Sequence, residues 1–344
     1  MLATIARRLL QLPIILLVIY TLTLALAWGV PGNPLENPEG RQPPPEVVEA
    51  MKRQYNLDSF WSFYGSYLES ATGVKHLRRS LGSTAAIDPA PPGVESGAAG
   101  PPLPRAAPPQ RTVFDLGPSL QYEDWRVNEI LADRLPVSMT LGLLAIILAV
   151  LIGVAAGVIG AVKPNGLADL LTLSVALVGI SLPSFVIGTV LLMVFAVWLK
   201  IAPVGGWGEL SHLPLPAVTL ALPFAAYIAR LTRMGMVEHL QSDFIRTARA
   251  KGVSEAGVLL RHALKNAFLP VLSYLGPACA MAMTGSFVVE KVFNVPGMGE
   301  MFVNAVLNKD LFLIIGVVMV FATVLVLLNL AVDVLYRWID PRIS

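Results

Sequence analysis

Long apolar runs dominate the pattern of hydrophobic and polar positions along the chain. A helix crosses a bilayer with about 20 mostly apolar residues, and six runs reach that length. They cover residues 9–29, 138–162, 170–199, 215–231, 267–289 and 311–335. The third run is interrupted by Pro183. The pattern therefore predicts an all-α membrane protein with six transmembrane helices.

The first apolar run admits two interpretations. Arg7 and Arg8 precede it, and Ala25-Leu26-Ala27 has the small-residue pattern of a signal-peptide cleavage site. The run spans residues 9–29, however, whereas the apolar core of a secretory signal has only about 7–15 residues. We therefore expect an uncleaved membrane anchor.

Basic residues in the short connections predict the orientation, because Lys and Arg concentrate on the cytoplasmic side of a membrane. Arg7 and Arg8 precede the first run, and Arg337 and Arg342 follow the last. The connection between the fourth and fifth runs has more basic than acidic residues. The basic ones are Arg233, Arg246, Arg249, Lys251, Arg261 and Lys265, and the acidic ones are Glu238, Asp243 and Glu255. We therefore expect both termini and this connection in the cytoplasm.

Composition supports the membrane interpretation and excludes other classes. Of the 344 residues, 55% are hydrophobic and 14% are charged, against about 25% charged residues in soluble domains. The net charge of +2 indicates no general attraction to nucleic acid. A single cysteine, Cys279, rules out an internal disulfide and a cysteine-based zinc site. Charged residues lie only near the ends of the apolar runs, which argues against a proton-coupled carrier.

The connection between the first and second runs, residues 30–137, is long and polar, and the orientation places it outside the cell membrane. Within it, residues 89–109 hold eight Pro, five Ala and three Gly. Such a stretch buries too little apolar surface to offset its ordering entropy, so we expect a flexible or polyproline-like insert over residues 72–112. Helices are expected before it, at 45–68, and after it, at 127–135, where the helix leads into the second run.

These patterns predict three parts. Residues 1–30 form an N-terminal transmembrane helix, residues 31–137 form the external segment with its insert, and residues 138–344 form a five-helix core. The core includes a cytoplasmic segment at about 233–266.

The cytoplasmic connection has the composition of two helices rather than of a loop. Residues 244–251 are rich in helix formers. Gly252 stands where a helix C-terminus favours a positive φ, and Ser254 can cap a second helix with Glu255 in its first turn. The second helix gains an apolar side from Val258, Leu259 and Ala263. Two interpretations stay open: a knob that fits a cleft in another protein, or an amphipathic element that lies on the membrane surface.

Sequence motifs favour the first interpretation. The connection reads Arg246-Thr-Ala-Arg-Ala-Lys-Gly252-Val-Ser-Glu255, and residues 259–264 and 266–270 continue the pattern. It resembles the coupling segment of the inner-membrane permease subunit of bacterial ABC importers, in the dipeptide, oligopeptide and nickel branch. Arg246-Thr247-Ala248 stands in place of the Glu-Ala-Ala motif of the wider family, and the interval from Gly252 to Pro270 is longer than in the general pattern.

Other stretches resemble the same branch, in the same order along the chain. They are residues 7–10, 31–34, 115–120 with 134–136, 289–293 with 296–299, and Asp333 with 340–342. The resemblance covers nearly the whole chain except residues 70–112, which include the Pro-rich stretch.

The resemblance implies a type I ABC importer permease fold in the bacterial inner membrane. It implies three kinds of partner besides membrane lipids: a second homologous permease subunit, which forms a heterodimer with this chain, two ABC ATPase subunits, and an extracytoplasmic substrate-binding protein. It implies that the partner ATPases use ATP and Mg²⁺, whereas this chain binds no cofactor and catalyses no reaction. The sequence agrees, since it contains no G-x-x-x-x-G-K-[ST] phosphate loop. The implied ATPase-coupling residues are Arg246, Thr247, Ala248, Lys251, Gly252, Ser254, Glu255, Arg261 and His262.

Candidate pathway residues lie in two places. Pro183 invites a kink, and Ser181 and Ser184 add small polar groups beside it; the alternative is that these small residues only pack helices. Glu290 could meet the ammonium group of a peptide, or it could form an interfacial ion pair or face the lipid headgroups.

The expected cargo is a peptide delivered by the binding protein, with nickel, glutathione or an opine-like compound as alternatives. A non-ABC secondary carrier and a structural membrane protein are the alternative classes. Genes for a second permease, for ATPases and for a binding protein should neighbour this one if the importer interpretation holds.

Overall fold

The computed structural model describes residues 2–32, 34–35, 45–81, 113–122 and 125–339. Within them the regular structure is helical, apart from an isolated bridge between Pro118 and Arg126. The predicted all-α class is therefore confirmed for these residues. Most of the predicted insert, together with Arg342, lies outside the described residues.

The chain divides into two compact units, and each is described by itself. The first unit comprises Met1–Ile15, Arg134–Met301 and Phe321–Ser344, and the second comprises Leu16–Asp133 and Phe302–Val320. Four helices contribute residues to both units: the long α1 (Leu2–Gly29), α5 (Val127–Val162) and α15 (Leu311–Ile339), and the short α14 (Met298–Leu307).

Four helices are long and apolar enough to span a membrane, and two bent pairs raise the number to as many as six among the described residues. The four candidate spans are Ala6–Gly29, Val127–Val162, Leu210–Leu240 and Leu311–Leu335. The predicted helix at 127–135 is continuous with the second span in α5.

The third predicted span is broken rather than kinked. Helices α6 (Leu167–Ser181) and α7 (Ser184–Leu191), the latter continued by the π-helix η1 (Leu192–Trp198), meet at an angle of 110°. The residue before a proline avoids the helical region, and Leu182 is accordingly extended, with φ −83° and ψ 132°. A short 3₁₀ turn, η2 (Leu210–His212), then leads into α8 (Pro214–Leu240).

The fifth predicted span ends earlier than its hydropathy indicates. Its helix is α12 (Leu269–Met283), which follows α10 (Glu255–Gly257), the π-helix η3 (Val258–Ala263) and α11 (Leu264–Ala267) after a bend of 56°. Gly285 has φ +95° and separates α12 from the short helix α13 (Phe287–Val292), whose first turn is capped by the Ser286 hydroxyl.

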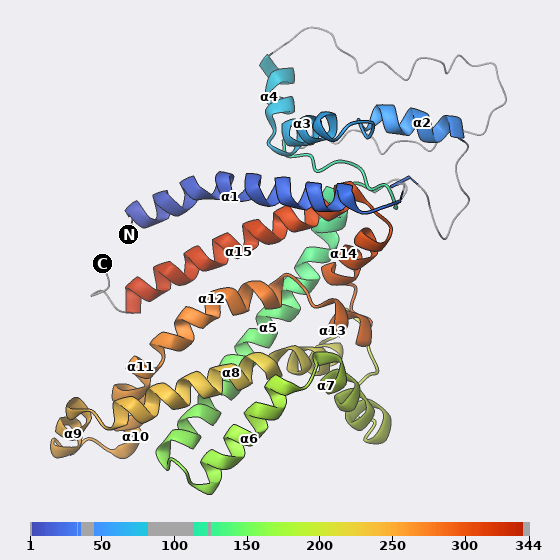
Figure 1. Cartoon of the computed structure of the whole chain (residues 1–344). Helices are drawn as coiled ribbons and strands as arrows, with labels where there is room; N and C mark the ends of the chain where they lie inside the picture. The colour runs from blue at the N-terminus through green and yellow to red at the C-terminus, as the bar shows by residue number, and fades with distance from the viewer. Residues whose placement is uncertain (1, 33, 36–44, 82–112, 123–124, 340–344) are drawn as a thin grey trace. The chain divides into compact units, whose positions relative to one another are not determined.

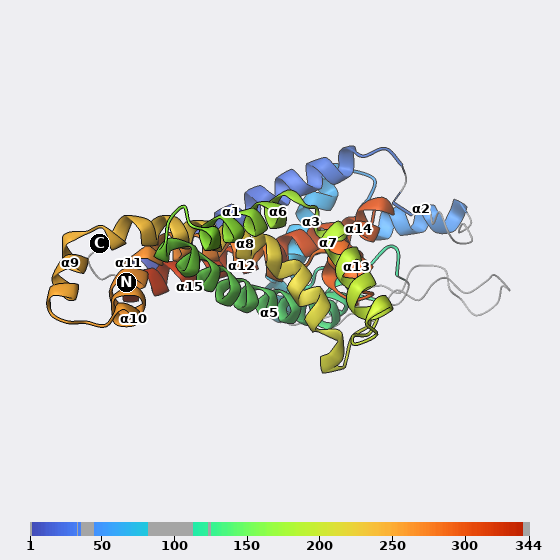
Figure 2. The same ribbon diagram turned by 90° about the horizontal axis from the view of Figure 1, so that it is seen from below.

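Small residues bring α5, α8 and α12 into close contact at the centre of the first unit, where Figures 1 and 2 show the three helices together. A Cβ on Gly142 would lie 2.3 Å from the carbonyl oxygen of Ala282 in α12, and one on Gly153 would lie 2.6 Å from that of Ala225 in α8. Such close approach of backbones is typical of helix packing inside membranes.

The second unit contains α2 (Pro45–Gln54), α3 (Phe60–Ala71) and α4 (Val74–Leu81). The predicted helix at 45–68 is thus two helices, separated at Asn56, which has φ +55°. Aromatic rings form much of the unit's core: the ring of Phe312 lies 5.1 Å from that of Phe63 and 5.9 Å from that of Tyr67.

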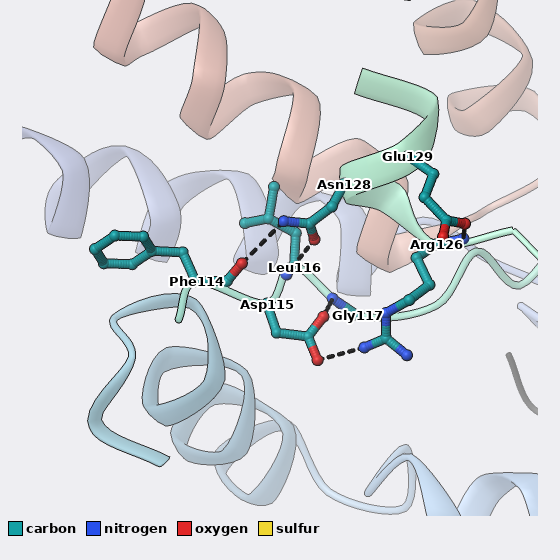
Figure 3. A network of polar contacts seen from close by, with 7 residues as sticks. All are labelled: Phe114, Asp115, Leu116, Gly117, Arg126, Asn128 and Glu129. Carbon is teal, nitrogen blue, oxygen red and sulfur yellow. Dashed lines mark hydrogen bonds and ion pairs between the residues drawn. The ribbon is translucent and has the colours of Figure 1, made fainter. Parts of the chain in front are cut away.

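Polar contacts fix the segment that enters α5 (Figure 3). Asp115 pairs with the guanidinium of Arg126 and accepts a hydrogen bond from the Gly117 N–H at 3.0 Å. The Asn128 side chain accepts from the Leu116 N–H and donates to the Phe114 carbonyl, each at 2.9 Å. These residues belong to the 115–120 motif and its surroundings, so within this unit the motif closes a loop.

Asp310 forms a second polar centre of this unit, at the start of α15. Its fully buried carboxylate accepts hydrogen bonds from the Ser119 hydroxyl and from the N–H groups of Leu120 and Leu313, the last two at 2.9 and 3.1 Å. Burial raises the pKa of the Asp310 carboxyl above its ordinary value, and these hydrogen bonds oppose the rise.

Candidate functional site

The cytoplasmic connection of the sequence prediction folds as a helix, a glycine turn and a second helix at the end of α8 (Figures 1 and 2). We name residues 243–267, which comprise α9 (Asp243–Ala250), α10, η3 and α11, the coupling segment. Gly252 has φ +75°. Its N–H donates to the Arg249 carbonyl at 3.0 Å, and the N–H of Val253 donates to the Ala248 carbonyl at 3.2 Å. This pair of bonds defines a Schellman turn, which requires a residue that tolerates positive φ.

Two side-chain contacts support the turn, one within the second helix and one between the two helices. The Ser254 hydroxyl caps the second helix by accepting from the Gly257 N–H at 3.3 Å, as its position in the sequence predicts. The Arg249 guanidinium makes a two-point contact with the Glu255 carboxylate, at 2.9 and 3.2 Å. The turn is therefore closed by backbone, hydroxyl and ionic contacts together.

The apolar side of the coupling segment packs on two of the long helices. Ile245, Ala248 and Val258 are buried in a cluster with Ala161 of α5 and Met236 of α8. The segment therefore packs this cluster against the protein, while Phe244 and Leu260 are 41% and 61% exposed. The buried cluster favours the knob interpretation over the surface-helix interpretation. Contact with α5 was not anticipated from the sequence, because only α8 and α12 flank the segment along the chain.

The predicted coupling residues divide by exposure. Ala248 is only 7% exposed, so it supports the segment from inside and offers no surface to a partner. His262 is half-buried. The other predicted residues are exposed: Arg246, Thr247, Lys251, Gly252, Ser254, Glu255 and Arg261. They give the outer side of the segment a mixed surface with a basic excess.

An ion pair that the sequence did not reveal lies at the foot of α6. Asp169, 1% exposed, binds the guanidinium of Arg233 in α8 through both oxygens and accepts from the Asn165 N–H at 2.7 Å. Arg233 stands ten positions before Asp243, so the pair connects the broken span to the helix that enters the coupling segment. The partners are 64 positions apart, and nothing local in the sequence pairs them.

The candidate pathway residues of the third span lie at its break. Ser181 ends α6, Pro183 is the N-cap of α7 and Ser184 begins it. Ser181 and Pro183 are exposed and Ser184 is half-buried, so this group is open on the surface of the chain.

Glu290 lies elsewhere and is fully buried. Its carboxylate accepts from the Ser138 hydroxyl at 2.7 Å and from the Gly299 N–H at 2.8 Å. The expectation of headgroup exposure is therefore wrong for Glu290, because the loop at 297–299 encloses its side chain. The exposed ion pair of this region joins Lys291 to Glu300, at 2.6 Å. Burial raises the pKa of the Glu290 carboxyl, and the hydrogen bonds from Ser138 and Gly299 oppose the rise.

These features define a multi-pass membrane protein with a helix–turn–helix element between two of its candidate spans, a class that includes the membrane subunits of transporters. Residues 135–344 match the family of binding-protein-dependent transport system inner membrane components, and the chain belongs to this family.

Curated relatives extend the similarity to the whole chain. The oligopeptide transport system permease protein OppB of Salmonella typhimurium is 39% identical over 100% of this chain and 99% of its own length. The dipeptide transport system permease protein DppB of Bacillus subtilis is 37% identical over 96% of this chain and 94% of its own length. The chain is thus a non-catalytic transmembrane subunit of an ABC importer in the bacterial inner membrane.

A solved structure shares the fold. The MetNI methionine ABC transporter, captured in inward-facing conformations, has a chain that aligns with 62% of this one and 97% of itself, with a TM-score of 0.50 and 15% identity.

Proposed function

We propose that this chain forms half of the translocation pathway of an ATP-driven importer, with six spans and both termini in the cytoplasm. In this arrangement the α6–α7 pair counts as one span and α12 forms the fifth, and the basic residues of the coupling segment fall on the cytoplasmic side. A second homologous permease supplies the other half. Two ATPase subunits, which use ATP and Mg²⁺, dock at the coupling segment, and a substrate-binding protein docks on the opposite side. Residues 1–30, 31–137 and 138–344 serve as anchor, external segment and core.

The observation that carries the mechanism is the closed glycine turn of the coupling segment. Alternation between outward- and inward-open states requires contacts whose free energy differs between the states. ATPase closure supplies that difference at the exposed residues Arg246, Lys251 and Arg261. Because α9 and η3 share one apolar cluster with α5 and α8, the segment moves as one body and displaces those helices.

The motion of the coupling segment and α8 acts on the break at Pro183. Asp169 ties the foot of α6 to Arg233 in α8, so movement of α8 pulls on α6. Ser181 and Ser184 then lie at the junction whose angle changes, where they line the pathway. Glu290 stabilises the opposite end of the core and does not contact cargo.

The cargo is a peptide. Support comes from the relatives, which are named for oligopeptide and dipeptide transport and match the chain over nearly its full length. Identification of the ligand that copurifies with the cognate binding protein tests this assignment, and nickel, glutathione or an opine-like compound in that position would replace it.

The central experiment substitutes the glycine of the turn. Gly252→Val places a β-branched residue at φ +75°, a strained conformation that costs about 1–3 kcal/mol, although a Cβ there meets no neighbour within 4 Å. We expect normal membrane insertion, with at least about a tenfold loss of substrate imported per ATP hydrolysed. Uptake at the wild-type ratio would contradict the proposal.

Gly208→Val is the matched control. Gly208 also has a positive φ, +103°, and open space around a Cβ, but it lies between η1 and α8, outside the coupling segment. It should keep the wild-type ratio of uptake to hydrolysis. Equal uncoupling by both variants would show that backbone strain in general, rather than the turn, causes the effect.

Labelling of single cysteines tests the orientation. In a Cys279→Ala background, Asp243→Cys should react with a membrane-impermeant maleimide in inverted vesicles only, and Ser211→Cys in spheroplasts only. The reverse pattern would overturn the proposed topology.

A further inference from the structure

Helix α3 combines five aromatic residues with a fixed position on two membrane-spanning helices. Phe60, Trp61, Phe63, Tyr64 and Tyr67 fall within its first eight residues. The segment before α5 is polar as a whole, so this density of aromatic side chains stands out from its surroundings.

Contacts with α1 show at what depth α3 lies along the first candidate span. The Tyr20 hydroxyl donates to the Tyr64 carbonyl at 2.8 Å, and the Trp28 ring lies 5.8 Å from the ring of Phe60. Trp28 is the last residue but one of the candidate span Ala6–Gly29, and Tyr20 lies about two helical turns before it. Helix α3 therefore lies beside the end of this span.

Contacts with α15 set a second reference. Phe63 and Tyr67 pack on Phe312, which is the second residue of the candidate span Leu311–Leu335. The end of one span and the beginning of another thus meet the same face of α3. Both references place the helix at the boundary where the apolar part of the bilayer gives way to the headgroups.

The opposite face of α3 offers a large aromatic side chain to its surroundings. Trp61 is 74% exposed, while Phe63 and Tyr67 on the inner face are buried. The spans beside it are apolar outward as well, since Leu22 and Leu26 of α1 are 59% and 74% exposed. Trp is enriched at membrane–water boundaries because its ring is apolar and its indole N–H is polar.

Helix α4 adds charge of the sign that anionic headgroups attract. It follows α3 in the chain and belongs to the same unit. Its side chains of Lys75 and Arg78 are exposed, as are the apolar side chains of Val74 and Leu77. Basic residues beside exposed apolar and aromatic residues are the features of a helix that binds a membrane surface.

The geometry points to α3 as a lipid-interface helix, with Trp61 inserted among the headgroups and α4 bound to anionic lipid above it. The helix holds the segment between α1 and α5 against the membrane plane. This inference rests on α1 and α15 crossing the bilayer and does not depend on which side of the membrane α3 lies.

Fluorescence quenching tests the position of Trp61. The full-length chain and its Trp61→Phe variant are reconstituted in vesicles of phosphatidylcholine and phosphatidylglycerol, and the difference between their emission spectra isolates Trp61. We expect lipids brominated near the headgroup to quench this component more than lipids brominated near the chain end, and aqueous iodide to quench it weakly. Strong iodide quenching without quenching by brominated lipid would overturn the inference and favour a protein ligand for this face.

A spin label supplies an independent measurement with internal references. Nitroxides are placed at Trp61→Cys, Leu26→Cys and Asp243→Cys in the Cys279→Ala background. Leu26 is the lipid reference and Asp243, whose side chain is 95% exposed outside the spans, is the aqueous reference. The label at 61 should be more accessible to oxygen than to a water-soluble nickel complex, as at 26. Behaviour like that at 243 would overturn the inference, and aqueous behaviour at 26 would instead disprove the span itself.

Discussion

Two helix breaks in the first unit are built in opposite ways. At Gly252 the break is closed by a Schellman turn, by the Ser254 cap and by the Arg249–Glu255 ion pair. At Pro183 the helices meet at 110°, and within the residues that the structure describes no side chain caps α7. Side-chain contacts thus pin the first break, whereas the second depends on backbone hydrogen bonds, on packing and on the Asp169–Arg233 pair at the start of α6.

The difference assigns a mechanical role to each break. A pinned turn that packs on an apolar cluster transmits a displacement without changing shape, because close-packed protein interiors are stiff. A break without polar pins absorbs a change of angle at a few residues, as hinges do. The coupling segment therefore transmits the motion, and the α6–α7 junction responds by a change in the angle between its helices.

The largest effect is expected at the Asp169–Arg233 ion pair. This pair joins α6, which precedes the break at Pro183, to α8, which precedes the coupling segment. Asp169→Leu leaves Arg233 without its partner in a mostly buried position, and removing one member of a buried pair is strongly destabilising. We expect a marked fall in melting temperature in detergent and loss of uptake. The double variant Asp169→Leu with Arg233→Met should recover much of the stability but not the uptake. Full recovery of uptake would show that the pair is structural only.

The next effect in size concerns the unpinned break. Pro183→Ala restores an N–H and removes the constraint on Leu182, and in a helix interior alanine is favoured over proline by about 3 kcal/mol. The variant should sample straighter α6–α7 arrangements, with a severalfold fall in uptake and little change in the amount of protein in the membrane. Thr189→Ala, a substitution in α7 away from the break, serves as the control and should transport normally.

A smaller effect is expected from loosening the pinned turn. Glu255→Gln removes the charge that faces Arg249, and exposed ion pairs contribute little to stability. The melting temperature should stay within experimental error, whereas substrate imported per ATP should fall severalfold because the turn becomes less stiff. Unchanged coupling would mean that the backbone bonds of the turn are sufficient. Asp243→Asn, which weakens the exposed contact with Arg246 within one helix, is the matched control.

The smallest effect concerns Glu290, in the helix that packs on α7. Its raised pKa means that the folded protein binds this proton more tightly than the unfolded chain does. The resulting stability is complete below the ordinary carboxyl pKa and is lost as pH rises through the raised value. The melting temperature of the wild type should therefore fall over this window relative to Glu290→Gln, which does not titrate. Parallel pH profiles would contradict the assignment.

Sequence reasoning succeeded where the determining interactions are local. Gly252 and Ser254 act within a few residues of their own positions, so the turn and the cap could be predicted. The span boundaries depended on single residues with special backbone preferences: Pro183 was recognised as an interruption, but the angle of the break was not, and the turn at Gly285 shortened the fifth span.

Long-range contacts account for what the sequence did not show. Asp169 and Arg233 are far apart along the chain, and neither residue carries a local signal for the other. Glu290 was expected at a surface because it follows an apolar run, but the loop at 297–299 buries it. The contact of the coupling segment with α5 likewise required the fold.

The central claim is that the coupling segment moves as one body while the α6–α7 junction changes shape. Spin-label pairs test both parts in the assembled importer, with the Cys279→Ala background. One pair occupies Ala250 and Lys265, which are exposed in the coupling segment, and the other occupies Val175 and Val190, on either side of Pro183. Between the nucleotide-free and ATP-bound states, the first distance should stay constant and the second should shift. A shift within the coupling segment, with a constant distance across Pro183, would contradict the account.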